Sequence, residues 1–145
     1  MAEPELAAYF ARYEWHAEEI EPGVWRGTFA TERDDEFDLV VILGEEAVHF
    51  AVTPLAHVGE QADGAAHRAR LFGGLLRLNQ QMSLVRLALD EDGDVNLIAD
   101  LPRQGFEYAQ FAQVLDLLTQ YTDALAHEVQ RTAADPDYYS PLLRG

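Results

Sequence analysis

The chain has 145 residues, 48% of them hydrophobic, with a formal net charge of −16 and no cysteine. This size supports one core, and the missing cysteine excludes disulfides, thiolate nucleophiles and thiolate metal ligands. Residues 1–64 carry most of the negative charge, with 15 acids against three arginines, which opposes binding to nucleic acid or to an anionic membrane. No apolar run is long enough to span a bilayer and the N-terminus is acidic, so we expect a cytoplasmic protein.

Helical and alternating hydrophobic periods divide the first half of the chain into one helix and four strands. Residues 3–13 are expected to be helical, because Leu6, Phe10 and Tyr13 recur at helical spacing. The strands that alternation predicts lie at 15–20, 25–29, 37–43 and 48–52. Residues 21–24 have the Pro-Gly order of a type II turn. The first half therefore ends as an antiparallel meander.

The second half contains two further helices separated by a hairpin. Residues 53–64 lack a sustained period and contain proline and glycine, so we interpret them as a loop. Helices are predicted at 65–81 and 107–132, with strands at 85–89 and 95–101 on either side of the turn 92–94. The order α-β-β-β-β-α-β-β-α is typical of an α+β fold, an antiparallel sheet with helices packed on it.

We interpret residues 1–134 as a single domain and residues 135–145 as a C-terminal tail. The tail contains two prolines and has no repeat period. It is either disordered or held against the domain by Tyr138, Tyr139, Leu142 and Leu143, and the sequence leaves these alternatives open.

No motif in the sequence identifies a catalytic or metal centre. Asp90, Asp92 and Asp94 alternate as calcium ligands do, but the glycine and glutamate that a calcium loop requires are missing, so a solvated hairpin turn is the better interpretation. The five histidines lack the spacing of a zinc site, and neither serine lies in a nucleophile elbow. We therefore expect no metal, no cofactor and no enzymatic activity.

Two adjacent glycines, Gly73 and Gly74, interrupt the second predicted helix. Each costs about 1 kcal/mol relative to alanine inside a helix, so a close contact should compensate for them. That contact lies either within one chain or at a homodimer interface, where Leu71, Gly73, Gly74 and Leu78 would meet their symmetry mates. The sequence leaves both interpretations open.

The order of elements and several short strings resemble a known family. The string LLRLNQQ leads into a strand, and the Asp-Gly-Asp hairpin leads into ADLP and a long amphipathic helix. In these features residues 6–129 resemble the YbjN-like proteins, bacterial sensory transduction regulators similar to class I type III secretion chaperones. The resemblance implies a type III secretion chaperone-like fold, usually homodimeric, with no cofactor and no catalysis. In such chaperones, apolar patches hold an extended, non-globular segment of a client protein.

Our first hypothesis is a non-enzymatic, chaperone-like or regulatory module that binds a protein or peptide client as a cytoplasmic homodimer. The acidic surface favours a client that is basic or non-globular. The client would bind a sheet edge and the side chains of Tyr9, Tyr13 and Trp15, which lie off or at the end of the buried stripe of the first helix. Core packing is the alternative interpretation of these three aromatic residues.

Two other classes of function remain as alternatives. A small hydrolase or isomerase would combine His49 or His57 with a carboxylate assembled in three dimensions, and it would need a deep pocket. A structural subunit would only assemble, and it would leave no free apolar groove.

Overall fold

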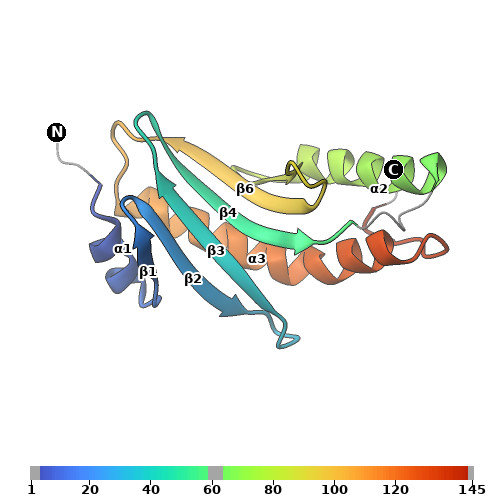
Figure 1. Ribbon diagram of the computed structural model, residues 1–145, viewed down its shortest axis with the longest axis horizontal. Helices are drawn as coiled ribbons and strands as arrows, with labels where there is room; N and C mark the ends of the chain where they lie inside the picture. Colours follow the sequence, from blue (N-terminus) through green and yellow to red (C-terminus); the bar gives the residue numbers. More distant parts are fainter. Residues whose placement is uncertain (1–3, 59–63, 144–145) are drawn as a thin grey trace.

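The computed structural model describes residues 4–58 and 64–143. The described chain has the order of helices and strands that the sequence predicts (Figure 1). The elements are α1 (Leu6–Tyr13), β1 (Glu18–Glu21), β2 (Val24–Ala30), β3 (Glu36–Leu43), β4 (Ala47–Ala56), α2 (Ala65–Gln81), β5 (Arg86–Leu89), β6 (Val95–Pro102) and α3 (Tyr108–Ala134). The predicted span of α2 is confirmed, and that of α3 is correct to within two residues.

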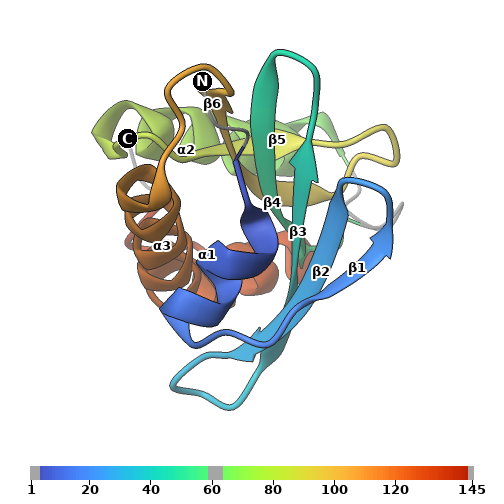
Figure 2. The same cartoon turned by 90° about the vertical axis from the view of Figure 1, so that its left-hand side faces the viewer.

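The described strands form one antiparallel sheet in the order β1-β2-β3-β4-β6-β5. Every second residue of the central strands is buried, which confirms the alternation seen in the sequence. The fully buried side chains of these strands are Leu39, Val41, Val48, Phe50, Val52, Leu55, Val95, Leu97 and Ala99. Figure 2 shows α1 and α3 together on this face, and no described helix covers the opposite face.

The long helix α3 lies across the covered face of the sheet. It begins with a capping box, in which Glu107 and Gln110 satisfy each other's main-chain N–H groups. The buried stripe of α3 includes Phe111, whose ring meets the Phe10 ring of α1 edge-on at 4.9 Å. The aromatic stripe predicted for the first helix therefore packs α1 onto α3.

Strand β4 is longer than the sequence predicts, because it continues to Ala56 where we expected a loop from residue 53. Pro54 donates no N–H and usually ends a central strand. Here the register with β6 shifts between Val52 and Ala56, so a bulge accommodates the proline. Residues 59–63 of the expected loop lie outside the described residues.

The C-terminal tail lies against α2 and α3, which decides between the two alternatives that the sequence left open. Ser140 and Leu143 are buried. The hydroxyls of Tyr138 and Ser140 donate to the Glu128 carboxylate of α3 at 2.6 and 2.8 Å. Arg70 of α2 donates to main-chain carbonyls of the tail. Both the apolar and the polar groups of the tail thus hold it in place.

Candidate functional site

The edge of the sheet at β5 is closed by a side chain. The amide of Asn79 on α2 donates to the Leu87 carbonyl at 3.0 Å and accepts from the Leu87 N–H at 2.7 Å. Asn79 therefore occupies the outward-facing main-chain groups of β5, as a neighbouring strand would. No further strand can pair there without displacing Asn79.

The opposite edge, β1, is open in the part of the chain that the structure describes. The Leu43 N–H donates to the Gly23 carbonyl at 2.8 Å. Because main-chain groups alternate in direction along a strand, the N–H and C=O groups of odd-numbered residues of β2 point toward β3 and those of even-numbered residues point toward β1. Glu18 lies opposite Arg26, whose main-chain groups point toward β1, so the main-chain groups of Glu18 point back toward β2. The N–H and C=O groups of the next residue, Glu19, therefore point outward, away from the sheet. No described strand lies beyond β1, and this edge can accept an additional one.

The side chains of β1 are acidic and exposed. Glu18, Glu19 and Glu21 surround Ile20, whose side chain is 56% exposed. Acidic side chains on an edge strand oppose its pairing with a second copy of itself. They favour instead a partner that carries basic side chains.

Two open grooves include residues of this edge. One groove, of about 460 Å³, lies between α1 and the β1–β2 turn, and Leu6, Trp25 and Leu43 are among its lining residues. The other, of about 260 Å³, is lined by residues that include His16 and Ile20. A segment added to β1 would therefore find places for its own side chains.

The three aromatic residues predicted to contact a client are half-buried beside the core. The Tyr9 ring lies 5.6 Å from that of Phe111, and the Trp15 ring lies 5.9 Å from that of Tyr13. The Tyr13 hydroxyl donates to the Asp116 carboxylate, and burial together with this bond raises the pKa of Tyr13. The structure thus brings Tyr13 and Trp15 together and packs Tyr9 on Phe111, and the contact of the three residues with a client stays a prediction.

The residues predicted for a dimer interface divide into two groups. Leu71 is fully buried in its own chain, and Gly74 is buried under Leu143 of the tail. Leu78 and Gly73 are half-buried, and a Cβ added to Gly73 would approach no atom closer than 3.6 Å. Packing within one chain therefore accounts for Leu71 and Gly74, while the role of this helix in a dimer stays a prediction.

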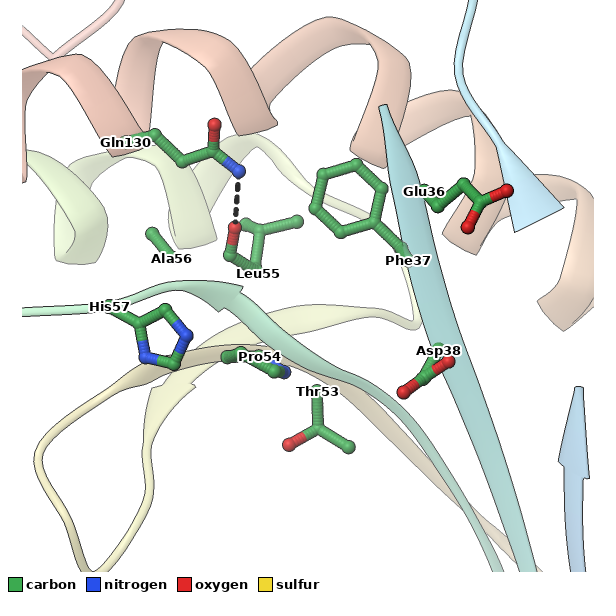
Figure 3. Close-up of a pocket in the computed structure, with 9 residues that line it drawn as sticks. All are labelled: Glu36, Phe37, Asp38, Thr53, Pro54, Leu55, Ala56, His57 and Gln130. Atoms are coloured by element: carbon green, nitrogen blue, oxygen red, sulfur yellow. Dashed lines mark hydrogen bonds between the residues drawn. The ribbon is translucent and has the colours of Figure 1, made fainter. Parts of the chain in front are cut away.

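A notch of about 580 Å³ opens between the start of β3 and the end of β4, and we call it the β3–β4 notch (Figure 3). Phe37, Leu55 and Ala56 are the buried residues that line it. Gln130 of α3 donates to the Leu55 carbonyl at 3.0 Å. The complete lining is Glu36, Phe37, Asp38, Thr53, Pro54, Leu55, Ala56, His57 and Gln130.

Both histidines considered for an enzyme are paired with carboxylates. His49 Nδ1 lies 2.5 Å from Asp100, which also accepts from Arg86, and His57 Nδ1 lies 3.1 Å from Asp94. Burial acts to raise the pKa of Asp100, but the hydrogen bonds from His49 and Arg86 outweigh it and lower that pKa. The side chains of His49 and His57 are 50% and 77% exposed, so solvent reaches both pairs.

The aspartates of the β5–β6 turn support the main chain. The Asp90 carboxylate accepts from the N–H groups of Asp92 and Asp94 at 2.9 and 3.0 Å, as expected for a solvated turn. Within residues 4–58 and 64–143, no three metal-ligating side chains are placed to hold an ion. In the same ranges, no helix is long and apolar enough to cross a membrane.

The sequence from residue 23 to residue 134 matches the family described as T3SS (YopN, CesT) and YbjN peptide-binding chaperone 1. The chain belongs to this family. It is therefore a non-enzymatic binding chaperone, which confirms the resemblance stated above and removes the alternative of a hydrolase or isomerase. No curated protein sequence matches the chain.

Solved structures with the same fold come from protein complexes. A chain of the heterodimeric ExoU–SpcU complex from the type III secretion system of Pseudomonas aeruginosa has a TM-score of 0.56 and 18% identity, with 85% of this chain and 96% of that chain covered. The ExsC–ExsE complex gives a TM-score of 0.58 and 15% identity, covering 86% and 90%. The HopA1–SchA chaperone–effector complex gives 0.54 and 14%, covering 83% and 88%. These likenesses confirm the chaperone-like fold.

Sequence reasoning missed two residues of this chaperone, Asn79 at the β5 edge and Gln130 at the β3–β4 notch. Each satisfies a main-chain group of a strand from a neighbouring helix. Neither position departs from the helical period, so hydrophobic patterning gives no signal for them. Pro54 is the one residue in the sequence that signals where β4 separates from β3.

Proposed function

We propose that this chaperone holds an extended, basic segment of a client protein along β1, and that it does so as a cytoplasmic homodimer. The contrast between the two sheet edges carries the proposal, because Asn79 closes β5 while β1 is open in the described chain. The family description supports a peptide as ligand. A cytoplasmic location follows from the same proposal, since a chaperone must meet its client before that client folds or leaves the cell.

A segment added to β1 would gain main-chain hydrogen bonds whatever its sequence. Each such bond contributes about 1 kcal/mol net, so main-chain pairing alone does not select a client. Selection would come from the glutamates of β1 and from the two flanking grooves. Tyr9, Tyr13 and Trp15 precede β1 in the chain and are only half-buried, so we propose them as apolar contacts for the client.

The homodimer is proposed to form around α2. Most of the large exposed hydrophobic side chains of the described residues lie on α2, on β5, between them, or on the tail that packs on α2. They are Leu76, Leu84, Leu89, Tyr139 and Leu142. Neighbouring exposed apolar side chains are typical of a surface that another protein covers. Gly73, which no neighbouring element covers closely, lies on the same helix.

Charge reversal on β1 tests the client-binding proposal. Glu18→Arg with Glu21→Arg should weaken binding of a labelled twelve-residue peptide of alternating valine and arginine by about tenfold, because attraction at the edge becomes repulsion. Fluorescence anisotropy measures the affinity. The control variant Glu91→Arg with Asp92→Arg alters the net charge equally but lies in the β5–β6 turn, and it should bind almost as well as the unaltered chain.

Equal losses in the two variants would mean that only the overall charge attracts the peptide, and the proposed site on β1 would be wrong. A peptide in which glutamate replaces arginine should not bind. Circular dichroism of both variants shows whether they are folded.

Light scattering after size-exclusion chromatography tests the homodimer. The unaltered chain should have about twice its mass of 16.3 kDa. Gly73→Leu should yield monomers, because a Cβ at this position meets its own chain only at ordinary contact distance, while a leucine would obstruct a helix packed against α2. A monomeric unaltered protein, or a Gly73→Leu protein that remains dimeric, contradicts the proposed interface.

A further inference from the structure

We propose that the β3–β4 notch is a second binding site, which takes three to four residues of the client as an extended strand inserted between β3 and β4. This inference rests on the proposed function, because it gives the client a second point of attachment. It differs from the edge site in that the segment would pair with main chains on both of its sides.

The pairing of β3 with β4 ends before either strand does. Their register runs from Leu43↔Val48 to Leu39↔Val52 and stops there. Continuation of the register would place Glu36 opposite Leu55, but no such pair forms. β3 instead stays paired with β2 as far as Glu36, while β4 follows β6 as far as Ala56. Figure 1 shows the two strands diverging toward this end of the sheet.

The main-chain groups that face the notch follow from the alternation of hydrogen bonds. The Gly44 N–H donates to the Ala47 carbonyl at 2.8 Å. Along the paired part of the two strands, the main-chain groups of even-numbered residues of β3 and of odd-numbered residues of β4 therefore point toward each other. Glu36 on β3 therefore directs its main-chain groups into the notch. On β4, beyond the register shift, the Leu55 carbonyl is placed at the notch by its bond to Gln130, which also lines it. An inserted strand would find hydrogen-bonding groups on both walls.

One feature of β4 keeps the walls apart in the free chain. Pro54, which would lie opposite Phe37 if the register continued, falls within the shift of the β4–β6 register. The bulge in the β4–β6 register turns β4 away from β3 over the same residues. The separation is thus built into β4 and does not depend on a mobile element.

Gln130 stands where the inserted strand would lie. Its side-chain amide donates to the Leu55 carbonyl at 3.0 Å, as the dashed line in Figure 3 shows. An unpaired buried carbonyl costs about 1–3 kcal/mol, so this bond satisfies a group that the missing strand leaves free. An inserted segment would replace Gln130 with its own N–H group.

The rim of the notch favours a basic segment. Glu36 is exposed at its mouth and follows Asp34 and Asp35 in the β2–β3 turn. Asp38 lies farther along the same wall, where Arg26 donates to it at 2.8 Å. Arginine or lysine at alternate positions of the segment would meet this negative charge, and proline would be excluded at the positions that pair.

Backbone NMR of the unaltered full chain tests the proposal. The probe is an acetylated, amidated hexapeptide of alternating valine and arginine. It should shift the signals of residues 36–38, residues 53–57 and the Gln130 side chain, and slow hydrogen exchange of the Glu36 amide by about tenfold. The same peptide with N-methyl groups on alternate residues should lose this effect, because it lacks the N–H groups of one side.

The variant Gln130→Met removes the competing donor at similar volume, so the peptide should bind the notch about fivefold more tightly. Gln120→Met, on an exposed part of α3, should change nothing. Shifts confined to β1 would overturn the notch and leave the proposed function intact. If the NMR signals of the notch shift with the peptide, and Glu18→Arg with Glu21→Arg does not weaken peptide binding, the notch site is upheld and the edge site on β1 is overturned.

Discussion

Leu143 of the tail packs so closely on Gly74 of α2 that a Cβ on the glycine would lie 2.7 Å from the Leu143 Cβ and 2.8 Å from its carbonyl oxygen. The glycine that the sequence marks as costly inside a helix is therefore required by the chain's own tail. The family match ends at residue 134, before this contact. The division into a domain of residues 1–134 and a tail stays a prediction, and a substitution at Gly74 measures how much the tail contact contributes to stability.

Alanine at the two helical glycines should have opposite effects. Gly74→Ala should lower the free energy of unfolding by about 1–3 kcal/mol, because the new methyl group meets main chain and Cβ atoms that cannot move aside easily. Gly73→Ala should raise it by about 0.5–1 kcal/mol, because alanine favours the helix and the site has room. Urea denaturation measures both. Equal effects in the two variants would show that the tail does not rest on Gly74.

Gly27 in β2 is required by Trp15. A Cβ at Gly27 would lie 2.8 Å from Trp15 Nε1 and 2.9 Å from the His16 carbonyl oxygen. Gly27→Ala should therefore destabilise the fold by about 1–3 kcal/mol, although alanine is ordinarily the better residue in a strand. Trp15→Phe with Gly27→Ala should recover part of the loss, which a double-mutant cycle in urea quantifies. Strict additivity of the two substitutions would contradict the contact.

Asn79 is predicted to prevent strand addition at β5. Asn79→Ala removes both bonds to Leu87 and should cost about 1–3 kcal/mol of stability. It should also cause concentration-dependent association beyond the assembly that the unaltered chain forms, because an open edge pairs with other chains. Gln80→Ala, an exposed neighbour, is the matched control. Analytical ultracentrifugation that finds the same assembly in all three proteins would mean that Asn79 does not close the edge.

Hydrophobic period predicts most of this fold, and the departures have local physical causes. The span of α2 is correct because its ends coincide with a change of period at Gly64 and Met82. The predicted end of β4, at residue 52, is wrong because Pro54 ordinarily breaks a strand, whereas a bulge accommodates it here. The order of the strands within the sheet depends on contacts between segments distant in the sequence, and the hydrophobic period of each segment does not encode these contacts. The same limit applies to the sites, since Asn79 and Gln130 bond to strands outside their own helices.

Acid should release the tail from α3 through Glu128. The hydrogen bond from Tyr138 lowers the pKa of Glu128 below its usual 4.5, burial opposes this, and the bond from Ser140 adds to it. Because the pKa is lower in the folded chain, the ionised carboxylate contributes stability that is complete above pH 4.5. That contribution is lost as the pH falls through the lowered value. The tyrosine ring signals in NMR spectra recorded across the titration report the release directly. In Glu128→Gln the tail signals should lack this acid transition, and a transition that persists there would assign it to another group.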